Sequence, residues 1–339
     1  MRALVTGATG FVGGYLTRAL LGRGDSVRVL SRTAERAAPL AAAGAEIRAG
    51  DVGEPASLAG VADGIDTVFH LVRSPTSASQ AEFDRIDVRG TELMLSEARR
   101  AGARRFVYVG TLAGYPPSGS RNAAALDERS PFDDSGLLGN YVQAKARAEA
   151  LVLAANIRSG DDRSGLETVI VRLGLVCGVG TSVFPAHVCQ KVSSGWVILF
   201  GDGRVPLPLV YVGNAVDALL LAATAQNVAG ESFNVVDDDV LSQGEYLALL
   251  RQVTGGRPKV LRLPRVSYFA LGWASELAAA ARGKEPATNR YRIKTRLAHL
   301  RWDCSKARSK LGWRPRTPLR EGLRQTFEKY AGIGGRVGA

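Results

Sequence analysis

Short apolar runs alternate with longer stretches rich in Ala and Leu over the first half of the chain. Runs such as Val68–Val72, apart from His70, and Phe106–Val109 are apolar at consecutive positions, so both faces of these strands are expected to be covered. Strands of this kind separated by helices predict a doubly wound parallel-sheet α/β fold. The predicted strands are Arg2–Thr6, Ser26–Ser31, Glu46–Ala49, Thr67–Val72, Arg105–Val109 and Thr168–Leu173, and the predicted helices are Val12–Arg23, Thr91–Ala101 and Tyr141–Asn156.

After Leu173 the alternation loosens into a segment rich in Gly and Pro, which we interpret as an insertion. The pattern predicts an α/β domain made of 1–177 together with 211–240, a smaller C-terminal α/β lobe made of 178–210 together with 241–330, and a flexible tail at 331–339. The expected elements after Leu173 are a strand at Ser232–Val236 and helices at Asn214–Ala225, Ser242–Val253, Ser267–Arg282, Ser305–Leu311 and Leu319–Tyr330.

The composition is that of an ordinary globular protein, with 46% hydrophobic and 22% charged residues among 339. The three cysteines, Cys177, Cys189 and Cys304, lack metal-ligand spacing, so we expect neither a disulfide framework nor a metal site. The chain opens on strand-like residues and has no run of 18 apolar residues, so we expect no signal peptide and no transmembrane segment. These features predict a cytoplasmic protein.

Positive charge is concentrated near the C-terminus. Residues 251–339 contain 21 Lys and Arg against 5 Asp and Glu, a net charge of +16, whereas residues 1–250 contain 23 against 27, a net charge of −4. This asymmetry indicates either a solvated basic surface or an acidic partner, such as an anionic substrate or an anionic membrane surface. The segment 290–296, with a cation at every second position, is expected to be an exposed strand edge, with diphosphate binding as the alternative.

Residues Tyr268–Ala281 are mostly apolar and lie between Arg265 and Arg282. The segment is too short to cross a bilayer. The favoured interpretation is a helix that packs on the core or covers a substrate pocket, because the segment has little charge on a distinct polar face. The alternative is weak association with a membrane surface.

A glycine motif follows the first strand and opens the first helix. Residues without side chains allow a tight turn there and let a pyrophosphate approach backbone amides at a helix N-terminus. Because the strand before the motif and the helix after it are both in place, we predict a dinucleotide site in a Rossmann-type domain. The predicted contacts in this loop are Gly7, Thr9, Gly10, Phe11, Val12 and Gly13.

The second strand ends at Ser31 and is followed by Arg32, where NAD-binding sites normally have an acidic residue for the adenosine ribose. Arginine offers several donors to a phosphate, whereas a carboxylate repels one, so NADP(H) is the expected cofactor and NAD(H) the alternative. Arg36 follows about one helical turn later. The other predicted cofactor contacts are Asp51, Val52 and Leu71.

Tyr141 and Lys145 stand four residues apart, on one face of a predicted helix. A nearby ammonium favours the phenolate form of tyrosine, which brings the phenol into range for proton exchange with an alcohol or ketone. Thr111, at the end of a predicted strand, can donate a hydrogen bond to the same substrate oxygen. These three residues are the predicted catalytic set.

Taken together, these motifs resemble the extended short-chain dehydrogenase/reductase family, which includes sugar-nucleotide epimerases, dihydroflavonol-type reductases and 3β-hydroxysteroid dehydrogenases. The resemblance implies that Thr111 takes the family's Ser/Thr position, that Tyr141 is the general acid/base, and that Lys145 lowers the pKa of Tyr141 and binds the nicotinamide ribose. The similarity is carried by TGATGFVG at 6–13, VRGT at 88–91, YVGTLAGY at 108–115, YVQAK at 141–145, LFGDGRVPLPLVYV at 199–212 and SKARSKLGWRPR at 305–316.

Several positions depart from the patterns of particular family members. Leu112 and Ala113 stand where sugar-nucleotide 4,6-dehydratases have an Asp-Glu pair, which argues against dehydration. Leu207 stands where many sugar-nucleotide enzymes have Arg. Asp87 and Gly110 replace a common Asn and a common Ser, changes expected to alter the proton relay or loosen the site.

The leading hypothesis is therefore an NADP(H)-dependent oxidoreductase acting on a small-molecule carbonyl or secondary-alcohol substrate, with an anionic or nucleotide-linked substrate left open. A sugar-nucleotide 4-epimerase or 4-ketoreductase is the alternative, and a non-catalytic nucleotide-binding subunit or sensor is the third hypothesis. No nucleic-acid partner is expected. The resemblance implies a homodimer formed through the helix that contains Tyr141, where Ala144, Ala146, Ala148 and Ala150 would permit close approach.

Overall fold

The computed structural model describes residues 1–75, 78–117, 125–133, 135–156, 165–193, 195–282, 286 and 288–332. Its centre is a seven-stranded sheet in the order β11-β6-β5-β4-β1-β2-β3, and every pair of neighbouring strands is parallel. The predicted doubly wound Rossmann fold is confirmed. The strands are β1 (Arg2–Thr6), β2 (Ser26–Ser31), β3 (Glu46–Ala49), β4 (Thr67–His70), β5 (Arg105–Thr111), β6 (Glu167–Leu173) and β11 (Glu231–Val235).

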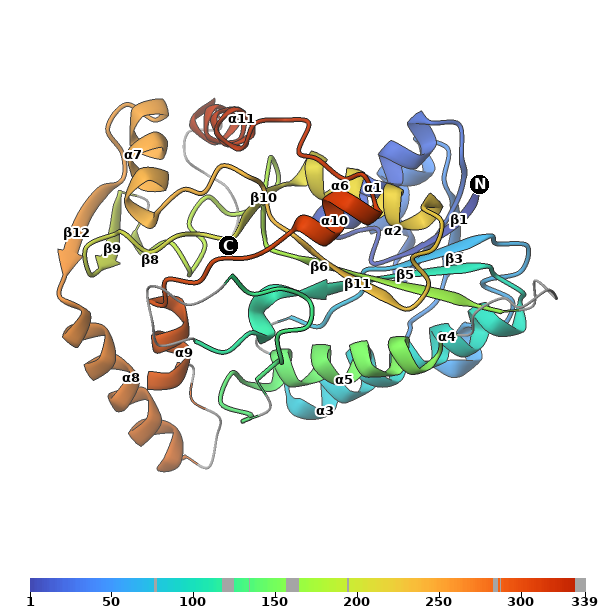
Figure 1. The fold of residues 1–339 in the computed structure, drawn as a ribbon, viewed down its shortest axis with the longest axis horizontal. Coiled ribbons are helices and arrows are strands. Elements are labelled where there is room, and N and C mark those ends of the chain that lie inside the picture. Colours follow the sequence, from blue (N-terminus) through green and yellow to red (C-terminus); the bar gives the residue numbers. More distant parts are fainter. Residues whose placement is uncertain are drawn as a thin grey trace.

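Helices cover both faces of this sheet (Figure 1). Successive side chains of a strand point to opposite faces, so Val5 enters the core under one layer and Leu4 the core under the other. One layer comprises α1 (Phe11–Gly22), α2 (Ala34–Ala41), α6 (Val212–Thr224) and α10 (Ser305–Lys310), and the other comprises α3 (Gln80–Phe83), α4 (Gly90–Arg100) and α5 (Asn140–Ala154). Single-turn helices lie at Pro55–Ser57 and Leu112–Gly114.

The helix predicted to begin at Thr91 is continuous from Gln80, because a π-helical turn at Asp84–Arg89 joins α3 to α4. Turns of this type widen a helix and occur frequently at functional sites. Here the turn buries Ile86 and Asp87 against the sheet. Apolar periodicity indicates a helix but does not indicate such a widened turn. The predicted helix, Thr91–Ala101, is therefore ten residues shorter than the observed helix, Gln80–Arg100.

A second group of elements lies at one end of the molecule, at the left in Figure 1. Its core contains Val197, Leu250 and Phe327 from three different elements. The division into two domains at the predicted boundaries remains a prediction. This group includes a three-stranded sheet in the order β12-β9-β8 and a parallel pair of β7 and β10. The elements are β7 (Leu175–Cys177), β8 (Gln190–Ser193), β9 (Trp196–Phe200), β10 (Leu209–Tyr211), α7 (Gln243–Val253), β12 (Lys259–Leu263), α8 (Arg265–Ala280), α9 (Arg290–Arg296) and α11 (Leu319–Gly332).

The prediction of an exposed strand edge at residues 290–296 is wrong, because this segment is helix α9. Asn289 caps the helix by accepting a hydrogen bond from the backbone N–H of Arg292 at 2.7 Å. In a helix, a residue at every second position turns through about 200°, so the four cations point in different directions instead of forming one strip. The predicted tail at 331–339 is also partly wrong, since Ala331 and Gly332 belong to α11. Residues 333–339 lie outside the described part of the chain.

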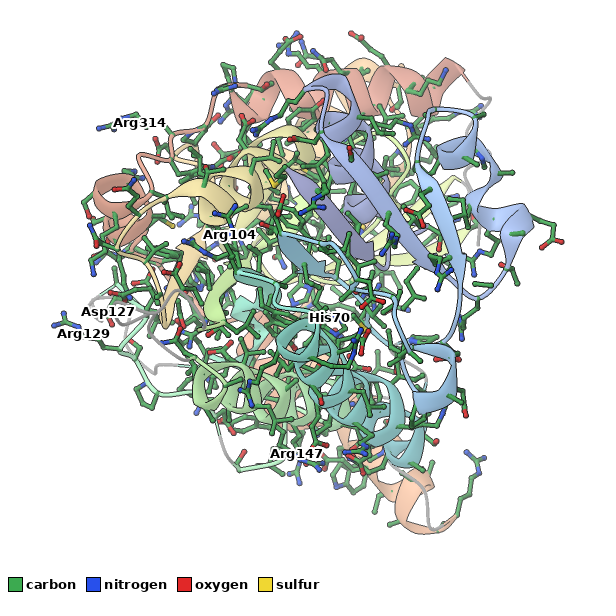
Figure 2. The ribbon with its side chains drawn as sticks, turned by 90° about the vertical axis from the view of Figure 1, so that its right-hand side faces the viewer. His70, Arg104, Asp127, Arg129, Arg147 and Arg314 are labelled. Atoms are coloured by element: carbon green, nitrogen blue, oxygen red, sulfur yellow. The ribbon has the colours of Figure 1, made fainter. Side chains whose placement is uncertain are left out.

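The four alanines of α5 do not share one surface. Ala144 and Ala148 are fully buried inside the chain, while Ala150 is exposed. Arg147, between them, points away from the sheet (Figure 2) and pairs with Asp84 at 2.5 Å. The structure therefore contradicts the expectation that all four alanines permit close approach of a second copy. Residues at every second position of a helix lie on different sides of it. The homodimer itself remains a prediction.

Candidate functional site

A cleft of about 1140 Å³ opens at the carboxyl ends of the parallel strands. Ligands of doubly wound proteins bind at this edge, because the loops that follow the strands meet there. All the predicted cofactor and catalytic residues line the cleft except Lys145, which lies behind it. The lining set comprises Gly7, Thr9, Gly10, Phe11, Val12, Gly13, Ser31, Arg32, Arg36, Asp51, Val52, Leu71, Thr111 and Tyr141.

Backbone packing explains two glycines of the loop after β1. Gly7 has a φ of +74°, and a Cβ there would lie 2.8 Å from the carbonyl carbon of Leu71. A Cβ at Gly13 would lie 2.3 Å from the carbonyl oxygen of Gly7. Backbone occupies both places, so a larger residue would displace the turn itself.

The first turn of α1 is open to the cleft. Gly10 is the residue before the helix, and having no side chain it leaves the first backbone N–H groups of α1 uncapped. Aligned N–H groups at a helix start carry a partial positive charge that favours an anion. The tight glycine packing and the uncapped helix start both fit the diphosphate of a dinucleotide.

Two arginines lie at the other end of the predicted dinucleotide site. Arg32 and Arg36 are exposed on the cleft wall, and within the described residues neither lies within ion-pair distance of a carboxylate. Ser31, which precedes them, is buried and donates its hydroxyl proton to the Thr33 carbonyl at 2.9 Å. Both guanidinium groups are therefore available to a ligand in the cleft.

Asp51 lines the same end of the cleft and is held by neighbours. Its Oδ1 accepts a hydrogen bond from the N–H of Gly53 at 2.9 Å, and its Oδ2 lies 3.8 Å from Arg85. These contacts fix the carboxylate of this predicted cofactor contact at the cleft wall. Val52 and Leu71 add apolar surface on either side of it.

Thr111 and Tyr141 meet at the catalytic end. Thr111 is the last residue of β5, Tyr141 lies in the first turn of α5, and their side chains are hydrogen-bonded to each other. Burial raises the pKa of Tyr141, while Arg73 and the hydrogen bond from Thr111 lower it and Asp87 raises it further. Tyr141 is thus a protonated phenol directed at the cleft, with a hydroxyl partner beside it.

Lys145 lies one turn further along α5 and is 4% exposed. Its Nζ donates hydrogen bonds to the carbonyls of Val109 at 3.2 Å and Val72 at 3.4 Å. Burial lowers the pKa of Lys145 to about 8, with Asp87 acting in the opposite direction. The cation found to lower the pKa of Tyr141 is Arg73, so the role that the resemblance assigned to Lys145 remains a prediction.

Arg73 was missed by the sequence analysis. It follows β4 by three residues, lines the cleft together with Tyr141 and is exposed. A cation directly after a strand that ends at the site was the available signal. The cleft is also lined by Leu207, Thr295 and Arg296, from segments that the sequence singled out for other reasons. Further lining residues that no motif indicated include His187, Ala298, Leu300 and Trp302.

A buried ion pair fixes α5 against the sheet. Arg172 on β6 donates to both carboxylate oxygens of Glu149 on α5, and it donates to the hydroxyl of Tyr115 at 2.7 Å. Gly110 makes room for this pair, because a Cβ there would lie 3.1 Å from side-chain atoms of both partners. The glycine expected to loosen the site therefore accommodates a contact that holds the helix of Tyr141 in place.

His70 is a buried residue of the central sheet, and Figure 2 shows it within the molecule. Its Nδ1 lies 2.8 Å from the Thr6 hydroxyl and its Nε2 lies 3.2 Å from the Thr91 hydroxyl. Burial, and secondarily Lys145, lower its pKa to about 3, so the ring is neutral at ordinary pH. In the described residues no group of three or more His, Cys, Asp or Glu is placed to hold a metal ion.

A model of the NAD dependent epimerase/dehydratase family matches residues 3–235, which include the glycine loop and the Thr111, Tyr141 and Lys145 set. The chain belongs to this family. The resemblance to extended short-chain dehydrogenases/reductases is thereby confirmed. The family uses nicotinamide cofactors.

Two relatives match nearly the whole chain. A 4-hydroxy-2-methyl-3-oxo-4-farnesyl-3,4-dihydroquinoline-1-oxide ketoreductase of Stigmatella aurantiaca is 31% identical over 327 residues, 95% of each chain. A 3 beta-hydroxysteroid dehydrogenase/Delta 5-->4-isomerase of Mycobacterium tuberculosis is 29% identical over 347 residues, 98% of this chain and 91% of that protein. Because the chain belongs to this family and is similar to a ketoreductase and a dehydrogenase over nearly its whole length, it is an oxidoreductase.

Among solved structures, MoeE5 in complex with UDP-glucose and NAD has the same fold. It superposes with a TM-score of 0.73 over 97% of this chain and 98% of its own, at 24% identity. The likeness extends over both the central sheet and the C-terminal group of elements. None of the described helices is long and apolar enough to cross a membrane.

Proposed function

We propose that this oxidoreductase is an NADP(H)-dependent ketoreductase, or in reverse a secondary-alcohol dehydrogenase. The observation that carries the proposal is the pairing of Tyr141 with Thr111 in a cleft whose other end presents Arg32 and Arg36. The first pair suits a carbonyl oxygen, and the second suits a phosphate. Both lie in one continuous cleft, as a reaction between a dinucleotide and a ketone requires.

The residues of the glycine loop would hold the cofactor diphosphate through the backbone N–H groups at the start of α1. Arg32 and Arg36 would bind the 2′-phosphate that distinguishes NADP(H) from NAD(H), because guanidinium groups form paired hydrogen bonds with phosphate oxygens. A carboxylate in place of Arg32 would favour NAD(H) instead. When bound, the nicotinamide supplies the hydride.

Thr111 and Tyr141 would both donate hydrogen bonds to the substrate oxygen, which polarises the carbonyl. The raised pKa of Tyr141 keeps the phenol protonated, so it can deliver a proton to the oxygen as negative charge develops there. Arg73 and Lys145 keep this end of the cleft electropositive, which stabilises the same charge. In the reverse direction Tyr141 would act as the phenolate and accept the proton from the alcohol.

The substrate region is the part of the cleft lined by Leu207, Ala298 and Leu300, which are apolar. Such a wall suits a bulky ketone of low polarity, and both relatives are named for a large, mostly hydrocarbon substrate. Arg73 and Arg296 lie in the same lining and would accept a carboxylate or phosphate on the ketone. A ketone with or without an anionic group is therefore the proposed substrate class.

The test is Tyr141→Phe. Because the change removes the proton donor and retains the ring, kcat for reduction of a ketone panel should fall about 10²- to 10⁴-fold. NADPH affinity, measured by fluorescence titration, should remain within about threefold of wild type. Activity near that of wild type would overturn the assignment of Tyr141. An inactive wild-type protein that binds NADPH would instead favour the nucleotide-binding subunit or sensor.

A sugar-nucleotide 4-epimerase or 4-ketoreductase is a second candidate. It is favoured by the fold shared with MoeE5, which was solved with UDP-glucose, and by Arg296 in the cleft. Of the four cations at 290–296, Arg296 alone lines the described cleft. The four cations therefore do not form one binding site for a diphosphate. Binding of UDP or dTDP by isothermal calorimetry would support this candidate, and no binding at millimolar concentration would eliminate it.

A further inference from the structure

Helix α8 exposes an apolar stripe to solvent. Val266, Ala270, Trp273 and Leu277 follow one another at spacings of four, three and four residues, which places them along one side of the helix. Val266 is 71% exposed, Trp273 54% and Leu277 53%. We refer to these four residues as the α8 stripe.

The opposite side of α8 is the one that packs on the protein. Tyr268 stacks on Phe200 with ring centroids 4.1 Å apart. At Gly272 a Cβ would lie 2.6 Å from Ile293 of α9, so the two helices approach closely there. α8 is therefore apolar on both sides, and its packing on the protein covers only one of them.

The favoured interpretation therefore holds for one side of the helix only, because Tyr268 packs in a core cluster with Phe200 and Ile293. The stripe itself is exposed, and no α8 residue is among those that line the described cleft. Figure 1 shows α8 at the outer end of the molecule, with α9 along its inner side. A helix that is apolar all round normally lies in a core or against a lipid phase.

Positive charge lies at both ends of the stripe. Exposed Arg262 precedes the helix and exposed Arg282 follows it. The acidic residue of α8, Glu276, is neutralised by Arg290 at 2.9 Å. These residues belong to the segment 251–339, whose net charge is +16.

We propose that the α8 stripe docks the protein on an anionic lipid surface. Apolar side chains on one side of a helix with cations around them are the features that bind helices in a membrane interface. Anionic headgroups attract each nearby cation, and the apolar stripe enters the boundary between headgroups and acyl chains. The helix need not cross the bilayer.

A second copy of this chain is a poorer occupant of the stripe. A twofold contact through α8 would bring the same surface of each copy together, and with it two regions of strong positive charge. Charges of one sign placed face to face oppose association. An anionic surface satisfies both the apolar side chains and the charge.

Docking through α8 would also bring the cleft near the lipid. α9 packs against α8 and contributes Thr295 and Arg296 to the cleft wall. A ketone that partitions into the membrane would then be concentrated near the cleft. This consequence rests on the proposed function, whereas the docking itself does not.

The experiment is co-sedimentation of the full chain with vesicles of phosphatidylcholine alone or with phosphatidylglycerol added. Wild type should bind the anionic vesicles at least about tenfold more tightly than the neutral ones. Val266→Gln with Leu277→Gln should weaken that binding by about tenfold or more, because both side chains leave the lipid phase. The matched control, Val240→Gln with Leu153→Gln, removes two exposed apolar residues that belong neither to α8 nor to its contacts and should bind as wild type does.

Trp273 provides a second readout, independent of the fold of the variants. Its emission should shift to the blue on anionic vesicles, and the shift should disappear in Trp273→Phe while binding persists. Equal binding by the stripe variant and wild type, or no binding of wild type to anionic vesicles, would overturn the proposal. Self-association that light scattering detects in wild type and not in the stripe variant would assign the stripe to a second copy instead.

Discussion

The two walls of the cleft are built in different ways. The wall toward the N-terminal half consists of loops that follow parallel strands, and backbone atoms of Gly7, Gly10 and Gly13 form its surface. The opposite wall consists of side chains from β-strand connections and short helices, such as Leu207 and Arg296. A backbone-built wall tolerates almost no substitution, whereas a wall of side chains changes its shape with each residue. The backbone-built wall suits a cofactor that is the same in every reaction, and the side-chain wall suits a particular substrate.

The largest effect should follow from substitution in the backbone-built wall. Gly13→Ala places a Cβ 2.3 Å from the carbonyl oxygen of Gly7, so the loop must move. We expect about 3 kcal/mol of destabilisation and loss of detectable dinucleotide binding, measured by thermal unfolding and by titration. Gly14→Ala is the control in the same helix, since its Cβ meets ordinary contacts at 3.4 Å or more. If Gly13→Ala bound cofactor as Gly14→Ala does, the distinction between the walls would fail.

A smaller effect is expected at the adenosine end of the same wall. Arg32→Ser removes a guanidinium from the proposed 2′-phosphate site, so the Kd for NADPH should rise about tenfold while the Kd for NADH changes less than about twofold. Arg48→Ser, an exposed arginine outside the cleft, is the matched control. Equal losses for both cofactors would mean that Arg32 contacts the adenine and does not read the phosphate.

The smallest effect is expected from Arg73→Gln, which removes a positive charge from the cleft and changes its shape little. Burial brings the pKa of Lys145 down to about 8, and Arg73 contributes to that lowering. NADPH affinity should therefore fall above about pH 8 as Lys145 loses its charge. Arg73→Gln removes the like charge, so the fall should move up by about one pH unit. An unchanged pH profile of the Kd would show that the two cations are not coupled.

The same contrast explains what the sequence could predict. The strands and the glycine loop follow from apolar runs and local spacing, so the sheet and the backbone-built wall were predicted nearly residue for residue. The helix at 290–296 and the π-helical turn at Asp84–Arg89 depend on a cap and on tertiary packing, which periodicity does not contain. Arg73 and Tyr141 share the cleft only because the loop after β4 and the start of α5 meet at the same edge of the sheet.

The sequence predicted helix α8 but not which of its sides is exposed. The helix itself was predicted from its composition, at Ser267–Arg282 against the observed Arg265–Ala280. Which of its sides faces solvent depends on Phe200 and Ile293, which belong to other elements. Sequence patterns thus gave the element, and only the folded chain gave its exposed face.

The central claim is that Arg32 and Arg36 select an exchangeable NADP(H) for a ketoreductase. The most direct measurement is to denature freshly purified protein with acid, identify any released nucleotide, and titrate the cofactor-free protein with NADPH and NADH. If Arg32 and Arg36 select NADP(H), no stoichiometric nucleotide should be released and the Kd for NADPH should lie at least about tenfold below that for NADH. Stoichiometric release of NAD, or equal affinities, would contradict the claim and would favour an epimerase that retains its cofactor.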